Sequence, residues 1–251
     1  MRTALKDAIK IAAVIVAVLF FTHSPVIAKF TAALNPASSS AASVQSNAAP
    51  MNAHPYMQVQ NNRPVAWSSC APISYVVNFT GAPSYAKHDL DLAIAKLEAA
   101  SGYRFVAAGT TNEIPNSSWT TNQQLVRPGY APVIIAFSTP NQTNLLQDGS
   151  SQMGAGDPAY VPASTGSVYV SGTAVINANQ QFSEGFSPGS PLGTLFMHEL
   201  GHVLGLDHSP NPASFMYPYL GVTTQSITSL DAAHLRALHA EGCPMAPAAG
   251  W

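Results

Sequence analysis

Charged side chains are scarce in this sequence of 251 residues. They make up 9% of it, with 10 Lys and Arg against 12 Asp and Glu, whereas soluble domains usually carry about 25%. The formal net charge of -2 gives the chain neither the strongly basic surface that nucleic acid attracts nor a strongly acidic one. We therefore expect no nucleic-acid partner.

Long apolar runs are also missing from the start of the chain. The run over residues 11–21 has eleven residues, fewer than the roughly 20 that a membrane-spanning helix needs. It follows three basic residues and precedes the small-residue site Val26-Ile27-Ala28, which together predict a cleaved signal peptide over residues 1–28 and a secreted or extracytoplasmic protein. The alternative is an uncleaved anchor, in which residues 11–28 hold the protein at a membrane.

Residues 29–66 lack a periodic apolar pattern. They are rich in Ala, Ser, Asn, Gln and Pro, a composition that cannot bury enough apolar surface to offset chain entropy. This segment is predicted to be a low-complexity linker or a removable pro-segment. Residues 67–251 then form one globular domain of ordinary size.

The domain shows both strand and helix patterns. β-Forming or apolar segments predict strands at residues 73–79, 103–107, 132–138 and 167–177, with a short edge strand near 154–162. Helices are expected at residues 85–100 after a Ser84 cap, from Pro191 after a Ser190 cap, and at residues 229–240 after a capping box of Thr228 and Asp231. The fold class is therefore α+β, with three main helices.

The most informative segment is residues 198–208, HELGHVLGLDH, which has the pattern H-E-x-x-H-x-x-G-x-x-H. On a helix, His198 and His202 project from one face and can reach a single metal ion. Gly205 is expected to end that helix in the left-handed conformation and to turn the chain so that His208 becomes a third ligand. Three nitrogens leave one position of a tetrahedral zinc site open, which is typical of catalytic zinc. Glu199, beside the first ligand, is placed to act as a general base.

Residues 198–209, HELGHVLGLDHS, together with Ser214-Phe215-Met216-Tyr217-Pro218, resemble the metzincin zinc endopeptidases, and within them the matrixins. The order of strands and helices over about residues 70–242 is similar as well. The resemblance implies a metzincin-like catalytic domain with a twisted mixed β-sheet, and a tight turn that places Met216 beneath the metal. It also implies that an extended peptide pairs with the edge strand, while Pro218, Tyr219 and Leu220 wall the pocket beyond the scissile bond.

The sequence departs from the matrixin pattern by what it lacks. No cysteine precedes Trp67, so the thiol latency device of secreted animal matrixins is missing. No histidine lies between His88 and His198, which excludes the His-rich second zinc site of that family from this stretch. Carboxylate ligands for calcium are scarce, because Asp148 and Asp157 are the only acidic residues between Glu113 and Glu184, so the sequence does not predict a calcium site there and leaves calcium binding undecided.

Only two cysteines are present, Cys70 and Cys243. In an exported protein, two thiols usually form a disulfide, which here would tie the first strand to the end of the last helix. The alternative is a cysteine thiolate that occupies the zinc and keeps the enzyme latent.

Together these features predict a monomeric, secreted zinc metalloendopeptidase with one catalytic zinc ion and a protein or peptide substrate. Zinc held by His198, His202 and His208 would activate a water molecule, and Glu199 would take the proton of that water and deliver it to the departing amine. Two alternatives remain: an exported zinc-holding binding module without turnover, and a membrane-tethered protease.

Overall fold

The computed structural model describes residues 54–117, 119, 130–149, 151–163, 166–221 and 223–246. The predicted signal peptide and residues 29–53 of the predicted linker lie outside these residues. Within them, no helix combines the length and the hydropathy that crossing a membrane requires.

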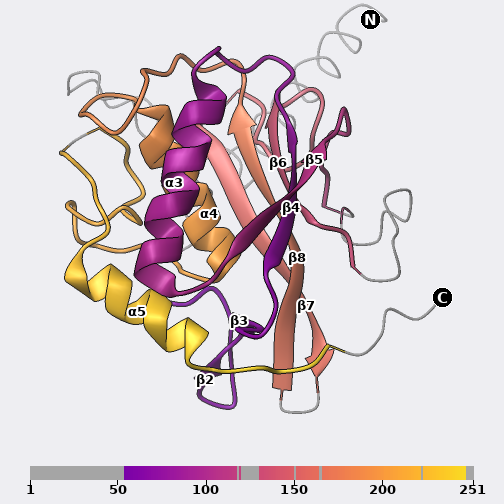
Figure 1. Ribbon diagram of the computed structural model, residues 1–251. Helices are drawn as coiled ribbons and strands as arrows, with labels where there is room; N and C mark the ends of the chain where they lie inside the picture. Colours follow the sequence, from indigo (N-terminus) through magenta and orange to yellow (C-terminus); the bar gives the residue numbers. More distant parts are fainter. Residues whose placement is uncertain are drawn as a thin grey trace, which may run out of the picture. The chain divides into compact units, whose positions relative to one another are not determined.

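A mixed sheet of six strands is the central element of the described part (Figure 1). Its strands are β3 (Ala66–Trp67), β4 (Ile73–Asn78), β5 (Phe105–Thr110), β6 (Val133–Ser138), β7 (Gly154–Ala163) and β8 (Gly166–Asn177). They lie in the order β3-β8-β6-β4-β5 with parallel pairing, and β7 pairs antiparallel with β8. A separate short hairpin is formed by β1 (Val59–Gln60) and β2 (Arg63–Pro64). The predicted α+β class with a mixed sheet is confirmed.

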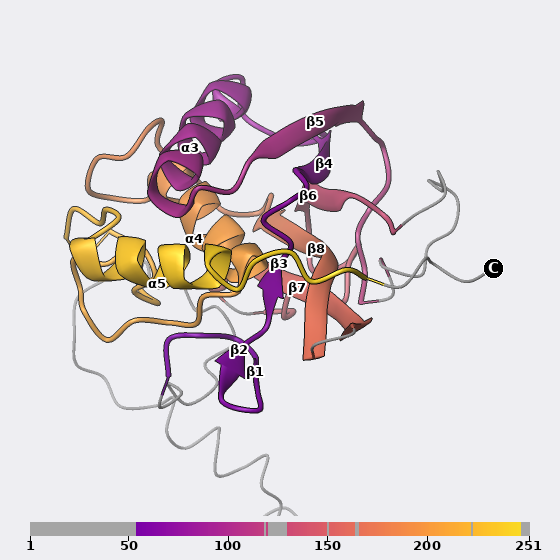
Figure 2. The same ribbon diagram turned by 60° about the horizontal axis from the view of Figure 1, so that its bottom comes forward.

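Three helices, α3 (Ala86–Ser101), α4 (Leu192–Leu204) and α5 (Ser229–His239), lie on the same side of the sheet in both views (Figures 1 and 2). Helix α4 is buried along its whole length, because it packs against α3 as well as against β7 and β8. Strand β6 is buried at every residue, with Phe137 contacting Phe196 of α4 on one face and Ile134 packing with Trp119 on the other. Both faces of the strand that was predicted at residues 132–138 are thus covered.

The helix starts differ from the prediction at two of three positions. Tyr85 and Pro191 occupy the N-cap positions of α3 and α4, and neither Ser84 nor Ser190 caps a helix with its side chain. In α4 the first N–H groups are already satisfied, because Leu192 donates to the Ser183 carbonyl and Gly193 to the Gly185 carbonyl, each at 2.9 Å. The capping box of Thr228 and Asp231 in α5 is confirmed.

The folded part begins upstream of the predicted boundary at residue 67. Val65 and Ala66 are buried, and the segment before them pairs through its backbone with the end of α4. The Met57 N–H donates to the Gly205 carbonyl, and the Asp207 N–H donates to the Pro55 carbonyl, both at 2.9 Å. Backbone pairing depends little on side-chain type, so a polar composition did not reveal it. The nature of residues 29–53 stays a prediction.

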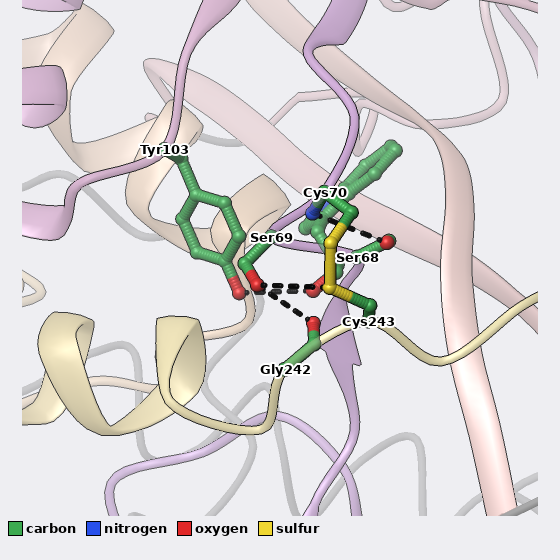
Figure 3. Close-up of a disulfide and its surroundings, with 7 residues drawn as sticks. Ser68, Ser69, Cys70, Tyr103, Gly242 and Cys243 are labelled. Atoms are coloured by element: carbon green, nitrogen blue, oxygen red, sulfur yellow. Dashed lines mark hydrogen bonds between the residues drawn. A yellow bond between two sulfur atoms is a disulfide. The ribbon is translucent and has the colours of Figure 1, made fainter.

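The disulfide between Cys70 and Cys243 is present, and both sulfurs are used in it (Figure 3). It joins the segment between β3 and β4 to the chain after α5, over a sequence separation of 173 residues. Ser69 supports the same junction, since its N–H and its hydroxyl both donate to the Gly242 carbonyl, at 2.8 and 2.9 Å. The alternative of a cysteine thiolate on the metal is therefore wrong.

Asp89, in the first turn of α3, is a fully buried carboxylate that holds the loop before α4. Its Oδ2 accepts the Gly185 N–H at 2.8 Å, whereas Oδ1 is buried and has no hydrogen-bond partner among the described residues. Burial raises the pKa of Asp89, and the Gly185 N–H only partly opposes this. The carboxyl group thus contributes to fixing the entrance of the helix that carries the HExxH residues.

Replacing Asp89 with asparagine should change how stability depends on pH. Because the folded-state pKa of Asp89 lies above its unfolded value, the unfolded chain loses this proton first as pH rises, so the group makes the fold less stable at higher pH. The unfolding free energy of Asp89→Asn minus that of the wild type should therefore increase between about pH 3 and about pH 7. Urea denaturation of the metal-free proteins measures this difference. Asp91→Asn, on the exposed side of α3, is the control, and a difference that does not vary with pH would contradict the prediction.

Candidate active site

Helix α4 ends where the sequence predicts, because Gly205 adopts φ 108° and ends it in the left-handed region. The Gly205 N–H reaches the carbonyls of Gly201 and His202. A side chain at Gly205 would also collide with the ring of Tyr169, since a Cβ there would lie 2.8 Å from Cε2. The chain therefore turns tightly at this glycine, and the turn returns His208 to the face of α4 that carries the other two histidines.

The imidazoles of His198, His202 and His208 form one cluster, in which the potential ligand atoms all lie within 4.8 Å of one another. The Nε2 atoms of His198 and His202 are 3.2 Å apart. The Nδ1 atom of His198 lies 2.8 Å from the Phe215 carbonyl oxygen, and that of His202 lies 2.8 Å from the Leu206 carbonyl oxygen. These carbonyls assign the proton to Nδ1 and leave the Nε2 lone pairs free for a metal.

Burial also favours the protonation state that a metal ligand needs. It is the largest cause that lowers the pKa of each of the three histidines, and it brings the pKa of His202 to about 4. Neutral imidazole is the form that coordinates metal ions. The donor set, its tautomers and its three-nitrogen composition fit a zinc ion with an open coordination position.

Glu199 directly follows His198 in α4 and is completely buried. Neither of its carboxylate oxygens has a hydrogen-bond partner among the described residues, and burial raises the pKa of Glu199 well above its usual value. An unpaired buried carboxylate is costly for the fold, so such a group is a candidate for chemistry. Glu199 is also the residue that the sequence predicts as the general base.

Gly154 of β7 provides the space for the Glu199 carboxylate. A Cβ at position 154 would collide with Oε1 of Glu199 and would lie 2.9 Å from both Cδ of Glu199 and the Val175 carbonyl oxygen. Gly156 approaches α4 equally closely, but there a Cβ would meet the backbone carbonyl of Glu199. Sequence reasoning did not find these two roles, because nothing in the spacing of the glycines shows which part of the chain approaches them.

Adding a methyl group at position 154 should displace the Glu199 carboxylate, the predicted general base, without disturbing the histidine cluster. We expect Gly154→Ala to retain zinc and to lower kcat about 10- to 100-fold, since small displacements of a catalytic group cost that much. Gly156→Ala is the matched comparison and should mainly lower stability, because helix backbone cannot move aside as a carboxylate can. Zinc content, kcat and melting temperature measure the three effects. A Gly154→Ala protein with the kcat of the wild type would contradict this role.

Met216 lies in a turn that packs against α4, and its predicted place beneath a metal stays a prediction. It is buried, and its sulfur occupies the space beside Gly201, between the turns of the helix that carry His198 and His202. The Met216 carbonyl accepts the Ser209 N–H at 2.9 Å, and the Met216 N–H donates to the Ser214 hydroxyl oxygen at 3.0 Å. The turn is thereby tied to the loop that follows His208.

The three predicted pocket residues lie directly after this turn but differ in exposure. Pro218 is half-buried, Tyr219 is exposed, and Leu220 is buried in the main apolar core. The buried Gln225 holds the segment, because its amide donates to the carbonyl of Tyr219 at 3.0 Å. A role for Pro218, Tyr219 and Leu220 in a substrate pocket stays a prediction.

The comparisons with known proteins agree with this arrangement. The sequence model of the matrixin family matches residues 118–240, a range that contains β6, β7, β8, α4 and α5 with the complete histidine cluster. No curated protein matches the chain.

Proposed function

We propose that the chain, which is similar to the matrixin family over residues 118–240, is a zinc-dependent endopeptidase that cleaves protein or peptide substrates outside the cytoplasm. The observation that carries the proposal is the cluster of three buried imidazoles, whose potential ligand atoms lie within 4.8 Å of one another, together with the unpaired buried carboxylate of Glu199, the residue after His198. A zinc site that only supports a fold has no use for such a carboxylate and normally has four protein ligands.

His198, His202 and His208 would hold the zinc ion. When bound at such a site, zinc lowers the pKa of water toward neutrality and polarises a carbonyl group. The carbonyls of Phe215 and Leu206 keep the His198 and His202 rings in the orientation and tautomer that ligation requires.

Glu199 moves the protons in this proposal. Its raised pKa in a buried site favours uptake of a proton from the attacking water at Oε1 or Oε2, followed by its delivery to the departing amine. No described residue donates a hydrogen bond to the Glu199 carboxylate, so both of its oxygens remain available to accept the proton. No covalent bond between the chain and the substrate is needed.

Export is supported by the disulfide. Bonds such as Cys70–Cys243 persist in oxidising compartments and are rare in the cytosol. Sequencing the N-terminus of the mature protein distinguishes a cleaved signal peptide from a membrane anchor formed by residues 11–28. A mature chain that starts near residue 29 would support secretion, and an intact first residue would support the tethered protease.

The test of the function is a digestion experiment with the zinc-loaded full chain. We expect cleavage of internal peptide bonds in a proteome-derived peptide library, loss of cleavage on removal of the metal by a chelator, and recovery on addition of zinc. Measured zinc binding without any cleavage would instead favour a binding module.

A further inference from the structure

Strand β7 presents one free edge beside the candidate active site. Among the described residues it pairs only with β8. Its residues Gly154 and Gly156 contact Glu199 and His202 of α4, so this part of the edge runs along the catalytic helix. Unpaired backbone groups on such an edge are available to an extended peptide.

The pairing register shows which backbone groups point outward. Asn177 donates its N–H to the Met153 carbonyl at 2.8 Å, so this opposed pair is a hydrogen-bonded pair of the antiparallel ladder. Such pairs alternate with pairs that are not hydrogen-bonded, which makes Ala155 and Asp157 face β8. Gly154, Gly156 and Pro158 therefore direct their backbone groups to the free edge.

The other side of β8 agrees with this assignment. Ala178, which follows β8, donates its N–H to the Ser138 carbonyl at the end of β6. Even-numbered residues at this end of β8 thus face β6, and odd-numbered ones face β7, as the Asn177 bond requires.

The three outward positions are not equivalent. Gly154 and Gly156 each offer an N–H donor and a carbonyl acceptor, whereas Pro158 has no N–H and offers only its carbonyl. A proline with its nitrogen toward the free edge leaves the bonds to β8 intact, which explains why the strand tolerates it. An added strand would therefore find donors on Gly154 and Gly156, none on Pro158, and the next one on Tyr160, beyond the register shift.

We infer that Pro158 is a specificity-determining residue, which interrupts main-chain recognition of the substrate after the positions paired with Gly154 and Gly156. This inference rests on the proposed function. A substrate residue opposite Pro158 keeps its carbonyl unpaired or hydrated, so lengthening a peptide in that direction adds little affinity. Selection acts mainly on the few residues next to the scissile bond.

Adding the missing donor tests this inference. The probe is the library peptide that the wild type cleaves best, capped at both ends and prepared in full length and in forms shortened one residue at a time. In Pro158→Ala we expect the KM of the longest peptide to fall about 2- to 10-fold, the range of one hydrogen bond, with kcat unchanged. Peptides too short to reach position 158 should show no change. Pro162→Ala removes a ring from the same strand beyond the register shift and is the matched control.

An unchanged KM for the long peptide, or an equal change for the short ones, would overturn the inference. A second measurement uses only the wild-type enzyme and so does not depend on the folding of a variant. Replacing single amides of the probe by esters, away from the scissile bond, should raise KM at alternate positions, since these lose their donors to the Gly154 and Gly156 carbonyls. Equal effects at adjacent positions would contradict the pairing. Absence of any zinc-dependent cleavage by the wild type would refute the proposed function itself, which separates the two failures.

Discussion

Replacing Glu199 with glutamine is expected to lower kcat by a factor of about 100 to 10,000, the contribution of a general acid-base group, with zinc content unchanged. Glutamine has nearly the same shape as glutamate but cannot take up a proton from water. The substitution removes the proton transfer and leaves the His198, His202 and His208 cluster intact. Steady-state kinetics on a cleaved library peptide, with metal analysis of the same preparations, measures both quantities.

The substitution should not destabilise the protein. Both carboxylate oxygens of Glu199 are buried without hydrogen-bond partners among the described residues, so a neutral side chain loses no such bond to them and avoids the cost of a buried charge. We expect a melting temperature for Glu199→Gln equal to or above that of the wild type. Glu184→Gln, at an exposed glutamate, is the matched control and should keep full activity. Loss of zinc from Glu199→Gln would show that the carboxylate is a ligand, and retained activity would remove it from the mechanism.

The parts of this site that the sequence predicted correctly are those determined by local structure. The spacing of His198 and His202 follows from the helical repeat, and Gly205 ends the helix because it alone adopts the required conformation without strain. The capping box of Thr228 and Asp231 spans only three residues, so its pattern is visible without the fold. Local physics also explains the approximate limits of the strands.

The parts that the sequence did not predict depend on contacts between distant segments. The Ser190 cap was expected from residue type, but carbonyls of Ser183 and Gly185 satisfy the first N–H groups of α4 instead. A side chain at Gly154 is excluded only because β7 packs against the Glu199 carboxylate. The pattern of residues 153–162 does not show this contact. The segment 55–57 folds against residues 205–207 through backbone bonds, which composition cannot show.

Removing the disulfide is expected to have the largest effect on stability. The Cys70–Cys243 bond encloses nearly all of the described fold, and closing a loop of 173 residues restricts the unfolded chain strongly. In the chain-entropy model, the Cys70→Ser, Cys243→Ser double variant should lose about 5 kcal/mol of unfolding free energy. At this chain length that corresponds to a fall in melting temperature on the order of 10 °C. Thermal and urea denaturation under non-reducing conditions measure the loss.

Reduction of the wild type provides the control for this prediction, because it opens the same bond without changing the sequence. The reduced wild type and the double variant should unfold at the same temperature, while the oxidised wild type unfolds well above both. Zinc content at low temperature should be equal in the oxidised wild type, the reduced wild type and the double variant. The predicted zinc ligands are histidines alone, and the two sulfurs are bonded to each other. A double variant as stable as the oxidised protein would show that the hydrogen bonds of Ser69 to Gly242 suffice to hold the end of the chain. The long loop would then contribute less than chain entropy requires.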